Sequence, residues 1–185
     1  MSKKIVILNG SPRKKGNTEM LCEAFADGAS SSGHTITRFD VHHMNIHACL
    51  GCIQGGKDPA SPCMQKDDMD LIYPAYVEAD IVVFASPMYF WSFTSQLKAV
   101  LDRLFAVAET NADYQTPHKN CIMLMAAEGD FESNWKPVLD YYHALLGHLG
   151  WKDCGTVLAG GVMHVGDIAG KPSLEEARQL GASIS

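Results

Sequence analysis

Residues 5–18 read Ile-Val-Ile-Leu-Asn-Gly-Ser-Pro-Arg-Lys-Lys-Gly-Asn-Thr, and this stretch is the most informative about the fold. Ile5 to Leu8 is a short run of large aliphatic residues, which is typical of a strand covered on both faces. Asn9 to Thr18 carries small, hydroxyl and basic side chains and leads into a helical pattern. A buried strand, a polar loop and a helix in this order predict the first unit of a parallel α/β sheet.

Similar units follow along the chain. Further strands are predicted at 81–85, 121–127 and 156–159, and residues 35–39 alternate in polarity as a strand nearer the sheet edge does. Helical spacing of apolar residues covers 18–29, 69–79, 97–104 and 138–149. A last helix is predicted from Pro172, with Ser173 and Glu176 as a capping box and Gly181 as its end. We predict a three-layer, doubly wound domain with a five-stranded parallel sheet that takes in residues 1–185.

The composition narrows the functional classes. The 185 residues are 46% hydrophobic with a net charge of −6, which disfavours nucleic acid as a partner because nucleic-acid binding depends on Lys and Arg. No apolar run is long enough to span a bilayer, and Lys3-Lys4 leads directly into the first strand without a secretion signal. Six cysteines are too few for a disulfide scaffold, so we expect a cytoplasmic protein. Because no apolar span is present, we expect no membrane partner.

The loop after the first strand has the chemistry of a phosphate site. Ser11, Asn17 and Thr18 offer hydrogen bonds, Gly16 permits close backbone approach, and the start of the helix offers free N–H groups. Arg13, Lys14 and Lys15 supply positive charge. The loop matches neither the Walker pattern nor the dinucleotide fingerprint. The alternative is a solvated turn in which Asn17 or Thr18 only caps the helix.

A second notable loop, Ser86 to Phe93, follows the strand at 81–85 and reads Ser-Pro-Met-Tyr-Phe-Trp-Ser-Phe. Its large aromatic and thioether side chains would be costly if simply exposed, so they face a flat ligand, a partner chain or the core. For Trp91 and Phe93 we favour packing or an interface.

Together these segments resemble one family. Gly-Ser-Pro-Arg-x-x-Gly-Asn-Thr, the Ser86-Pro87-x-Tyr89 segment after Asp80, and Lys98 with Asp102-Arg103 are similar to motifs of the NADPH-dependent FMN reductase family, which has a flavodoxin-like fold. The resemblance implies that FMN is the cofactor and that its phosphate binds the first loop. The residues that it assigns to FMN are Ser11, Arg13, Gly16, Asn17, Thr18, Ser86, Pro87, Met88, Tyr89, Phe90, Ala127, Glu128 and Gly129.

The resemblance also implies an activity. NAD(P)H as co-substrate reduces the flavin, which then passes electrons to a small acceptor such as a quinone, a nitro or azo compound, a metal ion or free flavin. The cofactor carries this chemistry, so no catalytic side chain is assigned. A homodimer or a dimer of dimers is expected. Two alternatives are a flavodoxin-like electron carrier and a non-catalytic flavin or thiol redox sensor.

Cys49, Cys52 and Cys63 resemble the cysteine segment of the iron-sulfur flavoprotein branch, but Gly55 stands where that branch has a further cysteine. A cluster would need another ligand, and zinc would need a histidine such as His47. A reversible disulfide between Cys49 and Cys52 is a third hypothesis. We favour relic cysteines or packing cysteines and assign no metal ligand.

Charged residues elsewhere in these motifs are expected to have structural roles. Lys98, Asp102 and Arg103 have helical spacing, which predicts a surface ion pair or an anchor between the helix and the sheet. Glu128 and Asp130 follow the strand at 121–127, where carboxylates would repel an anionic cofactor. We therefore expect one of the two to point outward.

Overall fold

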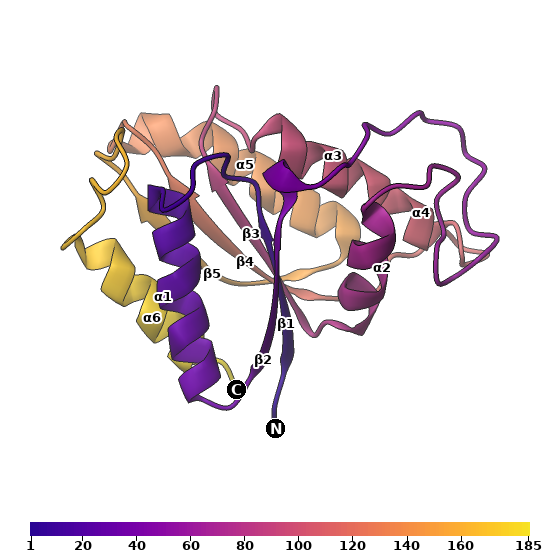
Figure 1. The fold of residues 1–185 in the computed structure, drawn as a ribbon, viewed down its shortest axis with the longest axis horizontal. Helices are drawn as coiled ribbons and strands as arrows, with labels where there is room; N and C mark the ends of the chain where they lie inside the picture. Colours follow the sequence, from indigo (N-terminus) through magenta and orange to yellow (C-terminus); the bar gives the residue numbers. More distant parts are fainter.

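A computed structural model describes all residues from 1 to 185, and its centre is a five-stranded sheet with helices on both faces (Figure 1). The strands are β1 (Lys4–Asn9), β2 (Thr35–Asp40), β3 (Ile81–Pro87), β4 (Asn120–Ala126) and β5 (Lys152–Ala159). The helices are α1 (Asn17–Ser31), the short 3-10 helix η1 (Val41–His43), α2 (Met69–Glu78), α3 (Ser95–Arg103), α4 (Phe105–Ala108), α5 (Glu132–Leu149) and α6 (Pro172–Ala182).

All neighbouring strands are parallel, in the order β2-β1-β3-β4-β5. The chain moves outward from β1 to β2 and then returns to the other side of β1 for β3. This reversal makes the carboxyl ends of β1 and β3 the expected place for a ligand in a doubly wound sheet. The predicted flavodoxin-like architecture is confirmed, including the edge position of β2.

Alternation along β1 explains the two helical layers. Ile5 and Ile7 face the cluster that contains α1 and α6, whereas Val6 and Leu8 face the larger cluster under α2, α3 and α5. All four side chains are at most 1% exposed. An apolar residue is therefore favoured at each of the four positions from Ile5 to Leu8, which accounts for the continuous run in the sequence.

Helices α1 and α6 lie side by side on one face of the sheet, and glycines allow their close approach (Figure 1). A Cβ on Gly28 would lie 2.0 Å from the Arg178 carbonyl oxygen, and a Cβ on Gly181 would lie 2.2 Å from the Phe25 carbonyl oxygen. Gly181 was predicted to end α6, but the helix continues to Ala182, so its role is packing. The capping box is also wrong, because α6 begins at Pro172 and the buried Ser173 hydroxyl has no partner.

Strand β5 begins earlier than predicted. The sequence indicated 156–159, whereas the strand starts at Lys152, where exposed polar residues interrupt the apolar pattern. Its register with β4 shifts between Cys121 and Met123, next to Gly155, whose φ of 140° suits glycine. No helix of the structure is both long and apolar enough to cross a bilayer.

Candidate functional site

A cavity of about 220 Å³ opens at the carboxyl ends of β1, β3 and β4. Four segments of the chain form it: the loop after β1, the loop after β3, the end of β4, and the segment between β5 and α6. The lining residues are Ser11, Arg13, Asn17, Thr18, Pro87, Met88, Tyr89, Ala126, Ala127, Glu128, Val162 and Met163. One end of the cavity is therefore polar and basic, and the rest has mainly apolar walls with one carboxylate, that of Glu128.

The polar end has free hydrogen-bond donors. The backbone N–H groups of Asn17 and Thr18, at the start of α1, donate no hydrogen bond within the protein, although both residues are buried. The buried Ser11 hydroxyl lies beside them and accepts a hydrogen bond from the Arg13 N–H at 3.3 Å. Unpaired N–H groups at the start of a fifteen-residue helix form a site for an anion such as a phosphate.

The segment after β5 covers this polar end, although no local pattern in residues 160–171 predicts this contact. Arg13 donates to the Met163 carbonyl oxygen at 2.5 Å. The Asn17 side chain donates to the His164 carbonyl oxygen at 2.9 Å and accepts from the Ile168 N–H at 3.3 Å. The Asn17 amide thus connects two parts of the chain, and only its backbone N–H faces the cavity unpaired.

Asp167 holds the same segment in shape. Its carboxylate accepts hydrogen bonds from the N–H groups of His164, at 2.7 Å, and Met163, at 2.9 Å. These two hydrogen bonds lower the pKa of Asp167. The segment is therefore a built wall of the cavity, to which it contributes Val162 and Met163.

The loop after β3 forms the opposite wall through Pro87, Met88 and Tyr89. The N–H groups of Met88 and Tyr89 are already used, donating to the carbonyl oxygens of Ala126 and Ser92. Ser86 does not line the cavity: it is fully buried, and its hydroxyl accepts from the Thr94 N–H at 3.0 Å. This serine fixes the loop that carries the lining residues.

Phe90 and Trp91 form the tip of that loop. Tyr89 and Ser92 pair across it, while Phe90 and Trp91 have φ values of 47° and 59°. Such left-handed conformations cost large side chains about 1 kcal/mol or more each. The side chains are 95% and 52% exposed, so Phe90 stands outside the cavity. Packing is confirmed for Phe93, which is buried against Phe84. Trp91 is exposed, so of its two predicted roles only the interface stays a prediction.

The loop after β4 contributes Ala127 and Glu128, whereas Gly129 does not line the cavity. The Ala127 N–H donates to the Ala159 carbonyl oxygen, and the N–H groups of Glu128 and Gly129 have no partner in the protein. Asp130 accepts from the Trp135 indole N–H at 3.4 Å and lies against Gly160, away from the cavity lining. The prediction that one carboxylate points away is confirmed for Asp130.

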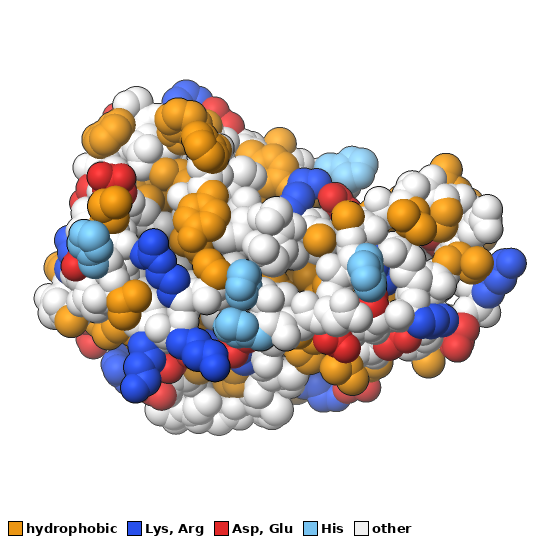
Figure 2. Space-filling view, turned by 45° about the horizontal axis from the view of Figure 1, so that its top comes forward, with side chains coloured by type: hydrophobic (Ala, Val, Ile, Leu, Met, Phe, Trp, Pro, Cys, Tyr) orange, Lys and Arg blue, Asp and Glu red, His pale blue; other side chains and the backbone are white.

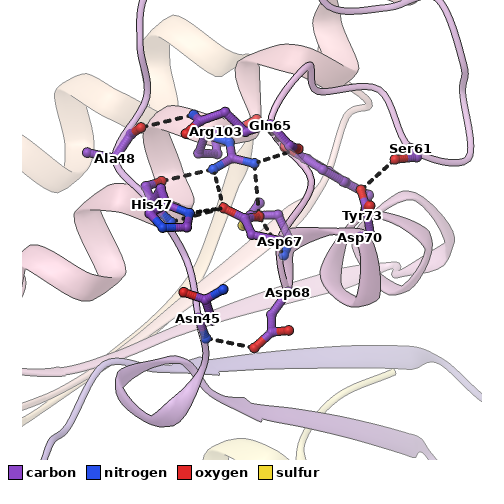
Figure 3. A network of polar contacts seen from close by, with 11 residues as sticks. Asn45, His47, Ala48, Ser61, Gln65, Asp67, Asp68, Asp70, Tyr73 and Arg103 are labelled. Carbon is purple, nitrogen blue, oxygen red and sulfur yellow. Dashed lines mark hydrogen bonds and ion pairs between the residues drawn. The ribbon is translucent and has the colours of Figure 1, made fainter.

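Cys49, Cys52 and Cys63 lie elsewhere, in the long segment 44–68 that has no helix or strand. A buried ion pair fixes the base of this segment (Figure 3). The Arg103 guanidinium donates to both Asp67 carboxylate oxygens, at 2.7 and 3.0 Å, and to the carbonyl oxygens of His47 and Gln65. Neither side chain of the pair is exposed. Arg103 is therefore an anchor, but of the cysteine segment rather than of the sheet, while Lys98 and Asp102 form the predicted surface pair.

Three thiols of this segment line a separate small cavity, of about 70 Å³, which we call the cysteine cavity. Cys49 and Cys52 are exposed and Cys63 is half-buried, so the packing interpretation is wrong for the first two. A Cβ on Gly55 would lie 2.3 Å from the Glu109 carboxylate, which occupies that space. No three or more His, Cys, Asp or Glu side chains are arranged to hold a single metal ion.

The sheet order and a phosphate site after β1 define the class: a flavodoxin-like α/β protein with its ligand cavity at the switch between β1 and β3. Residues 3–156 match the sequence profile of the NADPH-dependent FMN reductases. The chain belongs to the NADPH-dependent FMN reductase family and is an oxidoreductase whose cofactor is FMN.

Individual relatives agree with this family. An iron-sulfur flavoprotein of Archaeoglobus fulgidus is 30% identical over 182 residues, which cover 98% of this chain and 79% of the relative. A putative NAD(P)H-dependent FMN-containing oxidoreductase of Bacillus subtilis is 29% identical over 100 residues, or 54% of this chain and 51% of the relative. The solved NAD(P)H:quinone oxidoreductase of Methanothermobacter marburgensis shares the fold, with a TM-score of 0.76 at 24% identity over 98% of this chain and 96% of that one.

The relatives named iron-sulfur flavoproteins raise the question of whether this chain fits an iron-sulfur cluster. Such clusters are ordinarily held by four thiolates. The segment offers three, Gly55 has no side chain, and the Glu109 carboxylate fills the space beside it. The residues present therefore do not fit a four-cysteine cluster.

Proposed function

We propose that this protein uses FMN, held in the cavity between the loops after β1, β3 and β4, to pass electrons from NAD(P)H to a small-molecule acceptor. The observation that supports it best is the polar end of the cavity. There the unpaired N–H groups of Asn17 and Thr18 lie with Ser11 and Arg13, and apolar walls adjoin them. These residues fit a phosphate joined to a flat ring system.

Bound FMN supplies the hydride and electron chemistry, and the chain contributes binding and orientation. In this proposal Ser11, Arg13, Asn17 and Thr18 hold the phosphate. Pro87, Met88, Tyr89, Ala127 and Glu128 border the ring. Four further predicted residues act indirectly or from outside the cavity lining. Gly16 lies in the turn before α1, and Ser86 fixes its loop through the hydrogen bond from Thr94. Phe90 lies at the loop tip, and Gly129 offers a free N–H.

The exposed aromatic side chains next to the cavity support a planar molecule among the acceptors expected from the sequence. Tyr89 lines it, and Phe90 and Trp91 follow in the same loop. Aromatic faces suit planar acceptors such as quinones, nitro or azo compounds, or free flavin. The same exposed side chains suit an interface with a second copy, so we also propose a homodimer or a dimer of dimers. The proposal further includes a single flavin-binding unit over residues 1–185, a cytoplasmic location, and no nucleic-acid or membrane partner.

Anaerobic reduction tests this function. The purified protein is loaded with FMN, desalted and mixed with NADPH or NADH, and we expect the flavin absorbance to bleach. Adding a quinone or an azo dye should restore it and sustain turnover. A protein that binds FMN but is not reduced by either nucleotide would instead be an electron carrier or a sensor, and a protein that does not bind FMN at micromolar concentration would contradict the proposal altogether.

A further inference from the structure

A second polar cavity, of about 230 Å³, adjoins the loop after β1. It is lined only by polar residues: Asn9, Ser11, Arg13, Lys14, Lys15, Glu19, Arg38, Asp40 and His43. Ser11 and Arg13 also line the flavin cavity, whereas Lys14 and Lys15 do not. In the space-filling view, Lys and Arg side chains gather beside two His side chains in the lower left part of the molecule (Figure 2). The two lysines of the phosphate loop thus face a different space from the flavin cavity.

The carboxylates of this second cavity already have partners. Arg38 binds Asp40 at 2.7 Å and Glu19 at 3.0 Å. Asp40 also accepts from the Asn9 amide at 2.8 Å, and Glu19 accepts from the Lys15 N–H. The ammonium groups of Lys14 and Lys15, by contrast, form no ion pair. The walls are therefore held in place while two cations remain available to a ligand.

The backbone at Lys15 has an unusual conformation. Its φ of 54° is left-handed, a conformation that costs a residue with a Cβ about 1 kcal/mol. The hydrogen bond from the Lys15 N–H to Glu19 offsets part of this cost and fixes the turn.

The cavity holds four cationic side chains against two carboxylates, on a chain whose net charge is −6. This local excess of positive charge suits a phosphate monoester, which carries nearly two negative charges at neutral pH.

We propose that this second cavity binds the 2′-phosphate of NADPH through Lys14 and Lys15, and that it makes the protein select NADPH over NADH. This inference rests on the proposed function. Because the two cavities share Ser11 and Arg13, a dinucleotide whose nicotinamide reaches the flavin ring can extend its adenosine end across the phosphate loop. The phosphate of FMN carries a similar charge, but in this proposal it binds elsewhere, at the free N–H groups at the start of α1.

The test is a double variant, Lys14→Gln with Lys15→Asn, chosen because Asn tolerates the left-handed conformation at position 15. We expect kcat/KM for NADPH to fall at least about tenfold, as when charge-assisted hydrogen bonds are lost, and kcat/KM for NADH to stay within about twofold. A double variant Lys57→Gln with Lys136→Gln removes two exposed lysine charges outside both cavities and should leave the ratio unchanged.

Binding of 2′,5′-ADP and ADP to the FMN-loaded protein, measured by calorimetry, separates this inference from the proposed function. The wild type should bind 2′,5′-ADP more tightly than ADP, and the Lys14/Lys15 variant should bind both alike. Equal affinity of the wild type for both nucleotides would overturn the inference even if the protein oxidises NAD(P)H. Weaker FMN binding in the variant, with an unchanged NADPH preference, would assign the lysines to the flavin phosphate instead.

Discussion

The Glu109 carboxylate occupies the space that a side chain at residue 55 would need, since a Cβ on Gly55 would lie 2.3 Å from Glu109 Oε2. The Pro62 carbonyl oxygen crowds the same position at 2.9 Å. Position 55 carries no thiol, and two oxygen atoms lie where its side chain would stand. Arg103 holds the base of the cysteine segment, and Glu109 packs beside Gly55.

This relationship leads to a prediction about iron. After anaerobic incubation with iron and sulfide and then desalting, the wild type should keep no stoichiometric iron, because three thiols fall short of the usual four. The double variant Gly55→Cys with Glu109→Ala adds the fourth thiol and removes the carboxylate nearest to it, so it should keep more iron than the wild type. Metal analysis of both proteins checks this, and stoichiometric iron in the wild type would show that three thiols suffice.

The phosphate site predicts a difference between FMN and riboflavin. Ser11→Ala should lower the affinity for FMN about tenfold and leave the affinity for riboflavin unchanged, because the lost hydroxyl binds the phosphate. Asn17→Ala should weaken both ligands alike, since the lost amide holds the segment 163–168 and thereby the Val162 and Met163 wall. Fluorescence titration measures all four affinities. If Ser11→Ala weakened the binding of FMN and of riboflavin equally, the phosphate would not bind at this loop.

The buried pair of Asp67 and Arg103 predicts a pH dependence of stability. Burial opposes ionisation of Asp67, but Arg103 and the N–H groups of His47 and Met69 outweigh it and lower its pKa to about 2. A carboxyl whose folded pKa lies below its ordinary value of 3.8 stabilises the fold above about pH 4, and this contribution is lost as the pH falls toward 2. The loss amounts to about 2 kcal/mol of unfolding free energy.

Asp67→Asn should remove that part of the pH dependence and destabilise the protein by about 3–5 kcal/mol at neutral pH, because Arg103 is left buried without its partner. Urea unfolding at several pH values measures both effects. Asp102→Asn is the matched control, since its pair with Lys98 is exposed and should contribute at most about 1 kcal/mol. An unchanged stability of Asp67→Asn would mean that the pair does not anchor the cysteine segment.

Close packing of α1 against α6 predicts opposite effects for two helical glycines. Gly181→Ala places a Cβ 2.2 Å from the Phe25 carbonyl oxygen and should destabilise the protein by about 1–3 kcal/mol. Gly147→Ala in α5 meets no atom within 4 Å and should stabilise it by about 0.5–1 kcal/mol through helix propensity. Thermal unfolding of the two variants compares them directly, and a stabilised Gly181→Ala would show that the helices can move apart.

Much of the fold was predictable, because buried parallel strands leave continuous apolar runs such as Ile5 to Leu8. The start of β5 was not, since Lys152 and Asp153 are exposed at the sheet edge and do not follow the pattern. Gly181 was misread for a related reason. A glycine near a helix end is typical of a C-cap, and only the position of α1 reveals that it is needed for packing.

Local patterns of apolar, small and basic residues were sufficient to predict the strands and the main helices along the chain, the loop proposed to bind phosphate, and the family. The tertiary structure was needed to show which side each loop residue faces. It places Arg13 in the lining of both polar cavities and Lys14 and Lys15 in the lining of only one, and it brings residues 162–163 and Glu109 beside segments far from them in the chain. The physical reason is that such contacts arise from packing between elements, which local sequence patterns do not record.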